Sequence, residues 1–284
     1  MNLKSEKNLL FRIMTAVLGI PLVLGLLYFS WNSFLMLCGV LSLACIWEFL
    51  KITGINHSRK FMGAALLPPT LAWLAFMSQP HPGKIPEWTL VFILAVILLS
   101  AMVVLFDESG SQPIQTLALL VFTGVYIFLP FGLFYRLGYD PTGNYNFKIP
   151  LGILLLVWCS DTLAYITGRL FGKRKLMPSV SPSKTLEGAI GGFVFTIGLA
   201  WYLQSIWHQG TYDWRVLGLI IGIACPIGDL VESRLKRALE VKDSGGILPG
   251  HGGLLDRFDG FLLSIPAIYI YLELGNQLQF FIGY

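Results

Sequence analysis

Residues 214–259, WRVLGLIIGIACPIGDLVESRLKRALEVKDSGGILPGHGGLLDRFD, join an apolar segment to one dense in charges and glycines. The first part, 214–231, is long and apolar enough to cross most of the about 30 Å of hydrocarbon in a bilayer as a helix. The second part, 233–259, holds acidic and basic side chains at short intervals around a glycine-rich turn. Together the two parts predict a membrane helix that leads directly into a polar site.

The rest of the chain continues the apolar pattern. Its 284 residues are 55% hydrophobic and only 13% charged, with a mean hydropathy of +0.69, which is too apolar for a soluble domain. We therefore predict an all-α, polytopic membrane protein with about nine transmembrane helices. The predicted spans are residues 12–30, 33–52, 61–78, 88–106, 115–135, 149–169, 188–207, 214–231 and 260–281.

The basic residues divide unevenly between the two sides of these spans. All but four of the 20 Lys and Arg residues fall on the side that holds the N-terminus; the four exceptions are Lys84, Arg136, Lys148 and Arg215. The positive-inside tendency then places the N-terminus and the motif loops in the cytoplasm and the C-terminus outside. The short N-terminus and compact length favour a bacterial plasma (inner) membrane, and the modest net charge of +4 gives no reason to expect nucleic acid as a partner.

The charged part of the opening run has the chemistry of a metal-nucleotide site. Phosphate needs dispersed positive charge and open backbone N–H groups, and Mg²⁺ needs carboxylate oxygens. Asp256 and Asp259 are three residues apart, and Asp229 comes from the end of the preceding helix. Converging there, the three would bind one or two Mg²⁺ ions at the cytoplasmic membrane boundary. A structural pairing of Asp229 with a nearby basic residue is the alternative.

Two blocks of sequence resemble the phosphatidate cytidylyltransferases, also called CDP-diacylglycerol synthases. One block is similar to that family's signature through Ser233, Lys236, Arg237, Lys242, Asp243, Gly245, Pro249, His251, Gly252, Gly253, Asp256, Arg257 and Asp259. The other comprises residues 161–173 and 181–188 and departs from the family at Ser183 and Leu186, while keeping Lys184. The resemblance covers the C-terminal half. We thus expect a membrane region at 1–150, with about five helices, and a catalytic region at 151–284, with about four helices and two cytoplasmic motif loops.

The resemblance implies the reaction CTP + phosphatidate → CDP-diacylglycerol + pyrophosphate. The expected catalytic residues are Asp229, Asp256, Asp259, Lys242 and His251, of which the three aspartates also bind the metal. The expected substrate-binding residues are Lys184, Ser181, Lys236, Arg237, Arg257, Asp161, Gly252 and Gly253. The expected partners are CTP, phosphatidate, membrane lipid and, in a homodimer, a second copy of the chain.

Several interpretations stay open at the level of the sequence. Asp161 lies in an apolar stretch and either lines the site or contacts Arg169 on the same helix face; His251 is either an acid toward the leaving group or a structural donor. A CTP-dependent lipid-alcohol kinase, a cytidylyltransferase for another lipid phosphate, and a transporter of phosphorylated solutes are alternative functions. The four cysteines fall within predicted spans without a metal-binding spacing, so they are expected to be packing residues.

Overall fold

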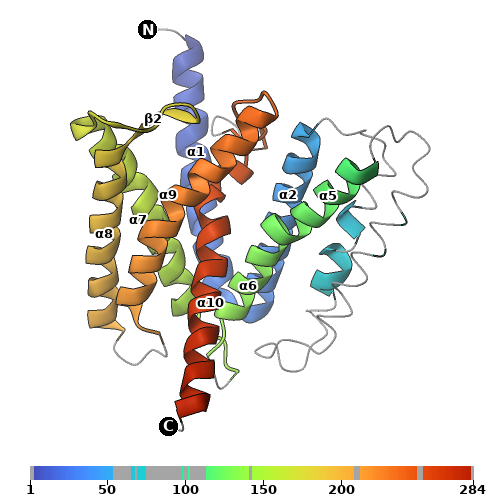
Figure 1. Ribbon diagram of the computed structural model, residues 1–284, viewed down its shortest axis with the longest axis vertical. Coiled ribbons are helices and arrows are strands. Elements are labelled where there is room, and N and C mark those ends of the chain that lie inside the picture. The colour runs from blue at the N-terminus through green and yellow to red at the C-terminus, as the bar shows by residue number, and fades with distance from the viewer. Residues whose placement is uncertain are drawn as a thin grey trace. The chain divides into compact units, whose positions relative to one another are not determined.

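The computed structural model describes residues 3–53, 65–67, 69–74, 98, 102, 113–140, 143–207, 212–247 and 252–282 (Figure 1). Helices dominate the described residues. In chain order the elements are α1 (Leu3–Phe29), α2 (Trp31–Ile52), α5 (Pro113–Thr123), the π-helix η1 (Gly124–Phe128), α6 (Leu129–Leu137), α7 (Lys148–Phe171), β1 (Lys175–Met177), β2 (Ser181–Thr185), α8 (Leu186–Ile206), α9 (Trp214–Ala238), the 3-10 helix η2 (Leu255–Arg257) and α10 (Asp259–Ile282).

Five helices of the described residues are long and apolar enough to cross a membrane. They are Trp31–Ile52, Ile114–Leu137, Lys148–Phe171, Leu186–Ile206 and Trp214–Ala238. The predicted all-α membrane architecture is confirmed to this extent, with one short hairpin of strands that the sequence did not predict. The spans predicted at 12–30 and 260–281 are helical, as α1 and α10. The span at 88–106 lies outside the described residues except for Leu98 and Met102, so nine helices remain a prediction.

Two predicted spans differ in detail from the observed helices. The span 115–135 is a helix interrupted by η1, where the N–H of Leu129 donates to the carbonyl of Gly124, five residues earlier. Pro130 follows directly and has no N–H to give, so a wider turn beside it relieves the clash with the preceding turn. The span 214–231 extends as α9 to Ala238, so Ser233, Lys236 and Arg237 are helical.

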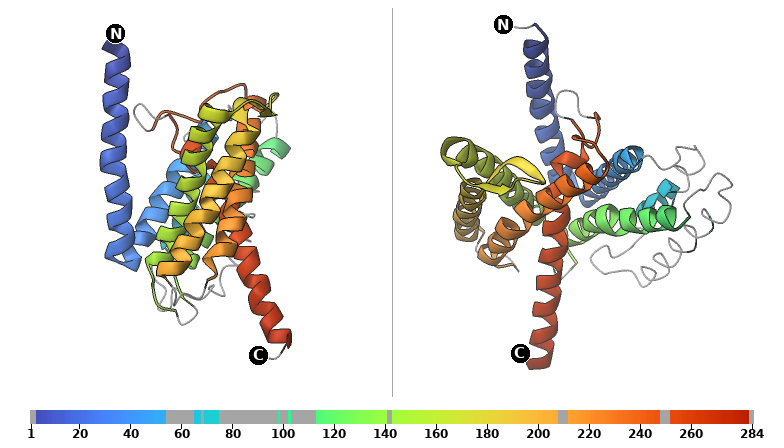
Figure 2. Two further views of the ribbon diagram at one scale, coloured as in Figure 1. Left: turned by 90° about the vertical axis from the view of Figure 1, so that its left-hand side faces the viewer. Right: turned by 45° about the horizontal axis from the view of Figure 1, so that its top comes forward.

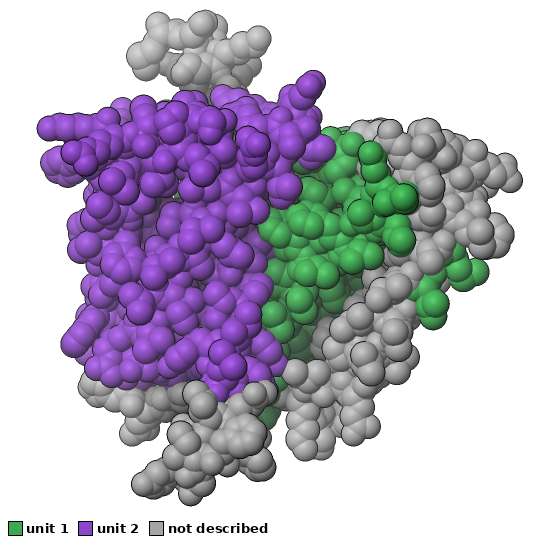
Figure 3. Space-filling model, viewed as in Figure 1, with its two compact units in different colours: residues 1–147, 243–257 green, residues 148–242, 258–284 purple. Residues whose placement is uncertain are grey.

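The chain divides into two compact units, coloured separately in Figure 3. The first comprises residues 1–147 and 243–257, and the second comprises 148–242 and 258–284. In the first unit α1 passes into α2 at Ser30, which caps α2 in a reciprocal pair of hydrogen bonds with Ser33. Its core packs the rings of Phe34 and Phe134 edge to face, with centroids 5.3 Å apart.

The second unit is built on α7, α8 and α9, which pack against one another, with α10 packed on α9 (Figure 2). Close approach of α7 and α8 depends on glycines, among them Gly188 and Gly192 of α8. A Cβ on Gly188 would lie 2.7 Å from the carbonyl oxygen of Ala164, and one on Gly192 would lie 2.7 Å from that of Ser160. Small residues let the backbones of membrane helices approach closely, where dispersion contacts hold them together.

The hairpin of β1 and β2 connects α7 to α8. The strands are antiparallel, and Lys175 pairs with Thr185. Thr185 also caps α8, because its hydroxyl accepts a hydrogen bond from the N–H of Gly188 at 3.2 Å. Glu187 secures the connection from α7, accepting from the N–H groups of Lys173 at 3.0 Å and Arg174 at 3.1 Å. The hairpin thus presents Ser181 and Lys184 from a fixed backbone.

Candidate functional site

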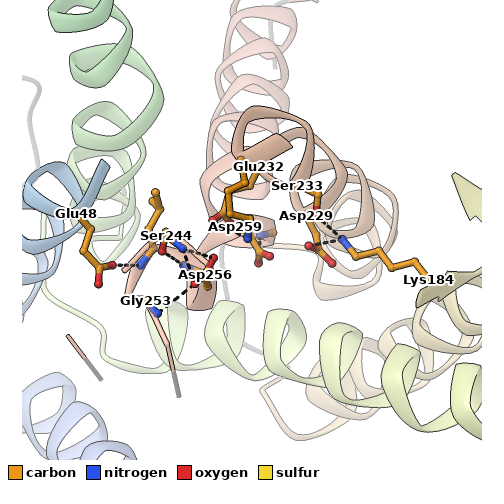
Figure 4. Close-up of polar contacts among 12 residues, drawn as sticks. Glu48, Lys184, Asp229, Glu232, Ser233, Ser244, Gly253, Asp256 and Asp259 are labelled. Carbon is orange, nitrogen blue, oxygen red and sulfur yellow. Dashed lines mark hydrogen bonds and ion pairs between the residues drawn. The ribbon is translucent and has the colours of Figure 1, made fainter. Parts of the chain in front are cut away.

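Lys184 and Asp229 form the centre of a polar cluster in the second unit. Lys184 comes from β2 and Asp229 from α9, and their side chains form an ion pair (Figure 4). The ammonium of Lys184 also donates to the hydroxyl of Ser233 at 3.3 Å, one helical turn after Asp229. The hairpin lysine is therefore held by α9, at the point where the predicted phosphate-binding and metal-binding residues begin.

Asp259 lies beside Asp229 because α9 and α10 approach closely. A Cβ on Gly228 of α9 would lie 2.6 Å from the carbonyl oxygen of Asp259, the first residue of α10, so position 228 requires glycine. The side chains of Asp259 and Asp229 are within hydrogen-bonding reach, and the charges of Glu232 and Asp161 also act on Asp259. Carboxylates from three helices therefore gather in one unit.

Other members of this cluster have partners of their own. Lys236 forms an ion pair with the buried Glu232 at 3.3 Å, one turn apart on α9. The thiol of Cys225 donates to Asp161 at 3.1 Å, which places Asp161 of α7 against α9. The structural alternative that paired Asp229 with a nearby basic residue of the same run is thus not what is observed, since Asp229 pairs with Lys184 and Lys236 with Glu232.

The donor set suits a hard divalent cation. Asp229 and Asp259 offer carboxylate oxygens, the donors that Mg²⁺ prefers. Two carboxylates this close repel each other, and a cation or a shared proton offsets the repulsion. As the side chains stand, the described part of the chain has no group of three or more His, Cys, Asp or Glu side chains able to hold a metal ion.

The loop Asp243–Arg257 belongs to the first unit and is organised around Asp256. Its carboxylate accepts from the N–H of Ser244 at 3.0 Å and from the N–H of Gly253 at 3.1 Å. The N–H of Asp256 donates in return to the hydroxyl of Ser244 at 3.3 Å. Gly252 adopts the left-handed backbone conformation, with φ of 84°, that favours glycine. Asp256 therefore closes its own loop, and its convergence with Asp229 and Asp259, which lie in the other unit, stays a prediction.

The end of α9 explains where this loop begins. The N–H of Val241 donates to the carbonyl of Lys236 at 3.0 Å and that of Glu240 to the carbonyl of Arg237 at 3.1 Å. This pattern closes the helix with Glu240 in the left-handed region at φ of 57°. Lys242 follows, exposed, so the helix ends just before the chain enters the first unit.

The remaining predicted residues occupy separate positions. Ser181 is buried in β2, and the guanidinium of Arg237 donates to the carbonyl of Val180 at 3.5 Å, so both stand near the hairpin. Arg257 is exposed at the end of η2 in the first unit. His251 lies outside the described residues, and its role stays a prediction.

Glu48 is a site residue that sequence reasoning missed. It lies in α2 (Figure 4). Its carboxylate accepts from two backbone N–H groups of the Asp243–Arg257 loop, those of Ile247 and Leu255. A signal was present in the sequence, because Glu48 is an acidic residue inside the apolar span 33–52. What the sequence did not contain was any indication of which distant segment it contacts.

Comparisons with known proteins agree with these features. The model of the cytidylyltransferase family matches residues 10–275. A phosphatidate cytidylyltransferase of Staphylococcus epidermidis is 33% identical over 266 residues, which cover 92% of this chain and 98% of that protein. Proteins of the same name from Staphylococcus aureus and Staphylococcus haemolyticus are 32% and 31% identical over the same length and coverage.

Proposed function

Because the chain belongs to the cytidylyltransferase family, we propose that it transfers the cytidylyl group of CTP to phosphatidate, forming CDP-diacylglycerol and pyrophosphate. The observation that carries the proposal is the cluster of Lys184, Asp229 and Asp259, which brings the ammonium of a lysine to a pair of carboxylates. The chain is an enzyme of the nucleotidyltransferase class. This finding disfavours the alternative function of a transporter of phosphorylated solutes.

The reaction needs no nucleophile from the protein. An anionic oxygen of phosphatidate forms a bond to the α-phosphorus of CTP, and the bond from that phosphorus to the β-phosphate oxygen breaks as pyrophosphate leaves. The work of the protein is to align the two phosphates and to offset their charge. Lys184, Lys236 and Arg237 supply positive charge for this purpose, from β2 and from the last turns of α9.

We also propose that Mg²⁺ is bound by Asp229 and Asp259, together with Asp256. When bound, Mg²⁺ would neutralise charge on the triphosphate as a Lewis acid. The carboxylate pair of Asp229 and Asp259 supports this assignment. Lys184 would then be shared between Asp229 and a substrate phosphate, and Asp161 would line the site beside α9.

The placement in the membrane follows the charge distribution. The apolar helices and the bacterial relatives support an integral protein of a bacterial membrane. We propose the inner membrane, with the N-terminus and both motif loops in the cytoplasm and the C-terminus outside, since the basic residues concentrate on that side. CTP would reach the site from water while the acyl chains of phosphatidate stay in lipid. Nine helices, a catalytic region at 151–284 and a homodimer remain predictions.

One assay tests the proposed reaction. The protein, purified in detergent, is incubated with phosphatidate, Mg²⁺ and CTP labelled on the α- or the γ-phosphate. Release of labelled pyrophosphate from the γ-label, with the α-label recovered in lipid, is the expected result. Release of CDP with the γ-label in lipid would identify a lipid kinase instead. Turnover with another lipid phosphate but not with phosphatidate would assign a different substrate.

A further inference from the structure

Glu48 is an acidic side chain buried in an apolar helix, where a carboxyl group is energetically unfavourable. It lies within α2, one of the apolar helices long enough to cross a membrane, and only 2% of its surface is exposed. Burying a carboxyl group in apolar surroundings is unfavourable unless hydrogen bonds replace those to water. The position of Glu48 therefore depends on the groups that it contacts.

Those groups are backbone amides of the loop Asp243–Arg257, far along the chain. The N–H of Ile247 donates to Oε1 of Glu48 at 3.2 Å, and the N–H of Leu255 donates to Oε2 at 2.9 Å. The two donors are 199 and 207 residues from Glu48 in sequence. Each carboxylate oxygen thus holds a different end of the Ile247–Leu255 stretch.

The loop is fitted to this carboxylate. A side chain on Gly245 would collide with Oε1 and would lie 2.8 Å from the carboxyl carbon of Glu48, so only glycine fits beside it. The same loop carries the hydrogen bonds among Ser244, Gly253 and Asp256. Glu48 therefore supports, from outside the loop, the segment that holds Asp256 and Gly253.

We propose that Glu48 is a positioning residue for nucleotide binding: it holds the Asp243–Arg257 loop in the conformation in which Gly252, Gly253 and Asp256 would bind the triphosphate of CTP. The role of the loop in nucleotide binding rests on the proposed function. The hydrogen bonds from the loop to Glu48 are a property of the fold and do not depend on it. Glu48 acts through the loop and does not touch the reacting atoms in this assignment.

The two acceptor oxygens predict how substitutions act. In Glu48→Gln one oxygen becomes an NH₂ group, which cannot accept, so one of the two amides loses its partner. Glu48→Asp keeps the carboxylate on a side chain one methylene shorter, so it cannot reach both amides as Glu48 does. Ser42→Ala is the matched control on the same helix. Its buried hydroxyl accepts from the indole N–H of Trp73 at 2.8 Å and has no hydrogen bond to the described residues of the loop.

The experiment measures loop protection and kinetics on the full-length protein in detergent. Amide hydrogen exchange of peptides spanning residues 243–257 should rise in Glu48→Gln and stay unchanged in Ser42→Ala. In the pyrophosphate-release assay, the CTP KM of Glu48→Gln should rise about ten-fold or more, because small misplacements of binding groups carry penalties of up to about 100-fold. The KM for phosphatidate should stay within two-fold. A general loss of folded protein would lower kcat without this selective change.

The outcomes separate the two proposals. If the wild-type protein releases no pyrophosphate, the proposed function fails, and hydrogen exchange still decides whether Glu48 holds the loop. If the wild-type protein turns over and Glu48→Gln matches Ser42→Ala in exchange and in CTP KM, the role of Glu48 is wrong. Should Glu48→Gln not fold, Ile247→Pro removes one donor at a side chain that is 44% exposed, and an unchanged CTP KM in that variant would equally overturn the inference.

Discussion

Lys184 of the β1–β2 hairpin is paired with Asp229 of α9, so the segment between α7 and α8 is tied to the helix that precedes the glycine-rich loop. The hydrogen bond from Lys184 to Ser233 joins the two blocks of sequence that resemble the family signature. A lysine bound to a carboxylate in this way can also reach an incoming phosphate, because its ammonium offers three donors and its contact with Ser233 uses only one more.

Replacing Lys184 should affect turnover far more than stability. We expect Lys184→Met to lower kcat/KM for CTP at least ~100-fold, since a cation that offsets transition-state charge is lost. Lys175→Met is the control, because Lys175 is an exposed cation on the paired strand of the same hairpin. Initial rates over a range of CTP concentrations check the prediction. Equal rates in the two variants would remove Lys184 from the site.

The carboxylate pair gives a prediction about metal dependence. We expect Asp229→Asn and Asp259→Asn each to reduce turnover at least ~100-fold and to raise the Mg²⁺ concentration for half-maximal rate. The thermal stability of Asp259→Asn in detergent should stay the same or rise, because the change removes repulsion between neighbouring carboxylates. In Asp229→Asn the loss of the ion pair with Lys184 opposes this gain, so its stability should change little.

Asp213→Asn is the control for these variants, at the other end of α9. Its carboxylate caps that helix, and hydrogen bonds from the guanidinium of Arg215 lower its pKa. Asp213→Asn should leave the Mg²⁺ dependence unchanged, because Asp213 lies at the other end of α9. Its ion pair with Arg215 is exposed, and exposed ion pairs contribute little to the free energy of unfolding. A pattern in which Asp229→Asn and Asp259→Asn lose stability but keep normal Mg²⁺ dependence would show that the pair is structural.

Two glycines of the same loop should respond differently to alanine. A Cβ on Gly253 would lie 2.9 Å from the Asp256 carboxylate and would collide with the hydroxyl of Ser244, whereas a Cβ on Gly246 would meet nothing within 4 Å. We expect Gly253→Ala to abolish most pyrophosphate release and Gly246→Ala to retain most of it. Assays of the two variants at matched folded concentration decide the point, and comparable loss in both would mean that the loop geometry is not what limits activity.

The orientation of the chain can be tested with single cysteines in a background whose native cysteines are replaced. Ser183 is exposed at the hairpin and Gly246 is exposed in the loop, so Ser183→Cys and Gly246→Cys should react with an impermeant thiol reagent only after the cells are opened. Asn144, exposed between α6 and α7, should react in intact cells when replaced by cysteine. Labelling of the first two from outside would reverse the proposed topology.

The cysteines themselves should be dispensable for chemistry. Cys38 and Cys45 are buried, and Cys225 donates to Asp161, so Cys225→Ser keeps a donor while alanine suffices at the other positions. We expect the cysteine-free variant to keep turnover within about five-fold, with any loss arising from packing defects of about 1 kcal/mol each.

Steady-state kinetics should be sequential. Ping-pong kinetics with label trapped on the protein from CTP alone would contradict direct attack by the lipid phosphate.

Much of the fold was determined by local properties of the sequence. Hydropathy over a window of one bilayer thickness is a local quantity, and it identified α2, α7 and α8 closely. It failed at the end of α9, because the helix continues as a charged segment beyond the apolar window. It also missed the β1–β2 hairpin, which lies in a polar connection that hydropathy treats as featureless.

The chemistry of the site was likewise indicated by the sequence, through the acidic and basic residues of 233–259 and through Lys184. Which of them pair was decided only by the tertiary structure. Lys184 of β2 meets Asp229 of α9. Glu48 of α2 meets the amides of Ile247 and Leu255 in the Asp243–Arg257 loop. In each case the partners come from distant parts of the chain. A sequence specifies which side chains can donate and accept hydrogen bonds. Their partners depend on which backbones approach closely, as at the contact of Gly228 with Asp259. No local sequence pattern encodes which two segments approach each other in this way.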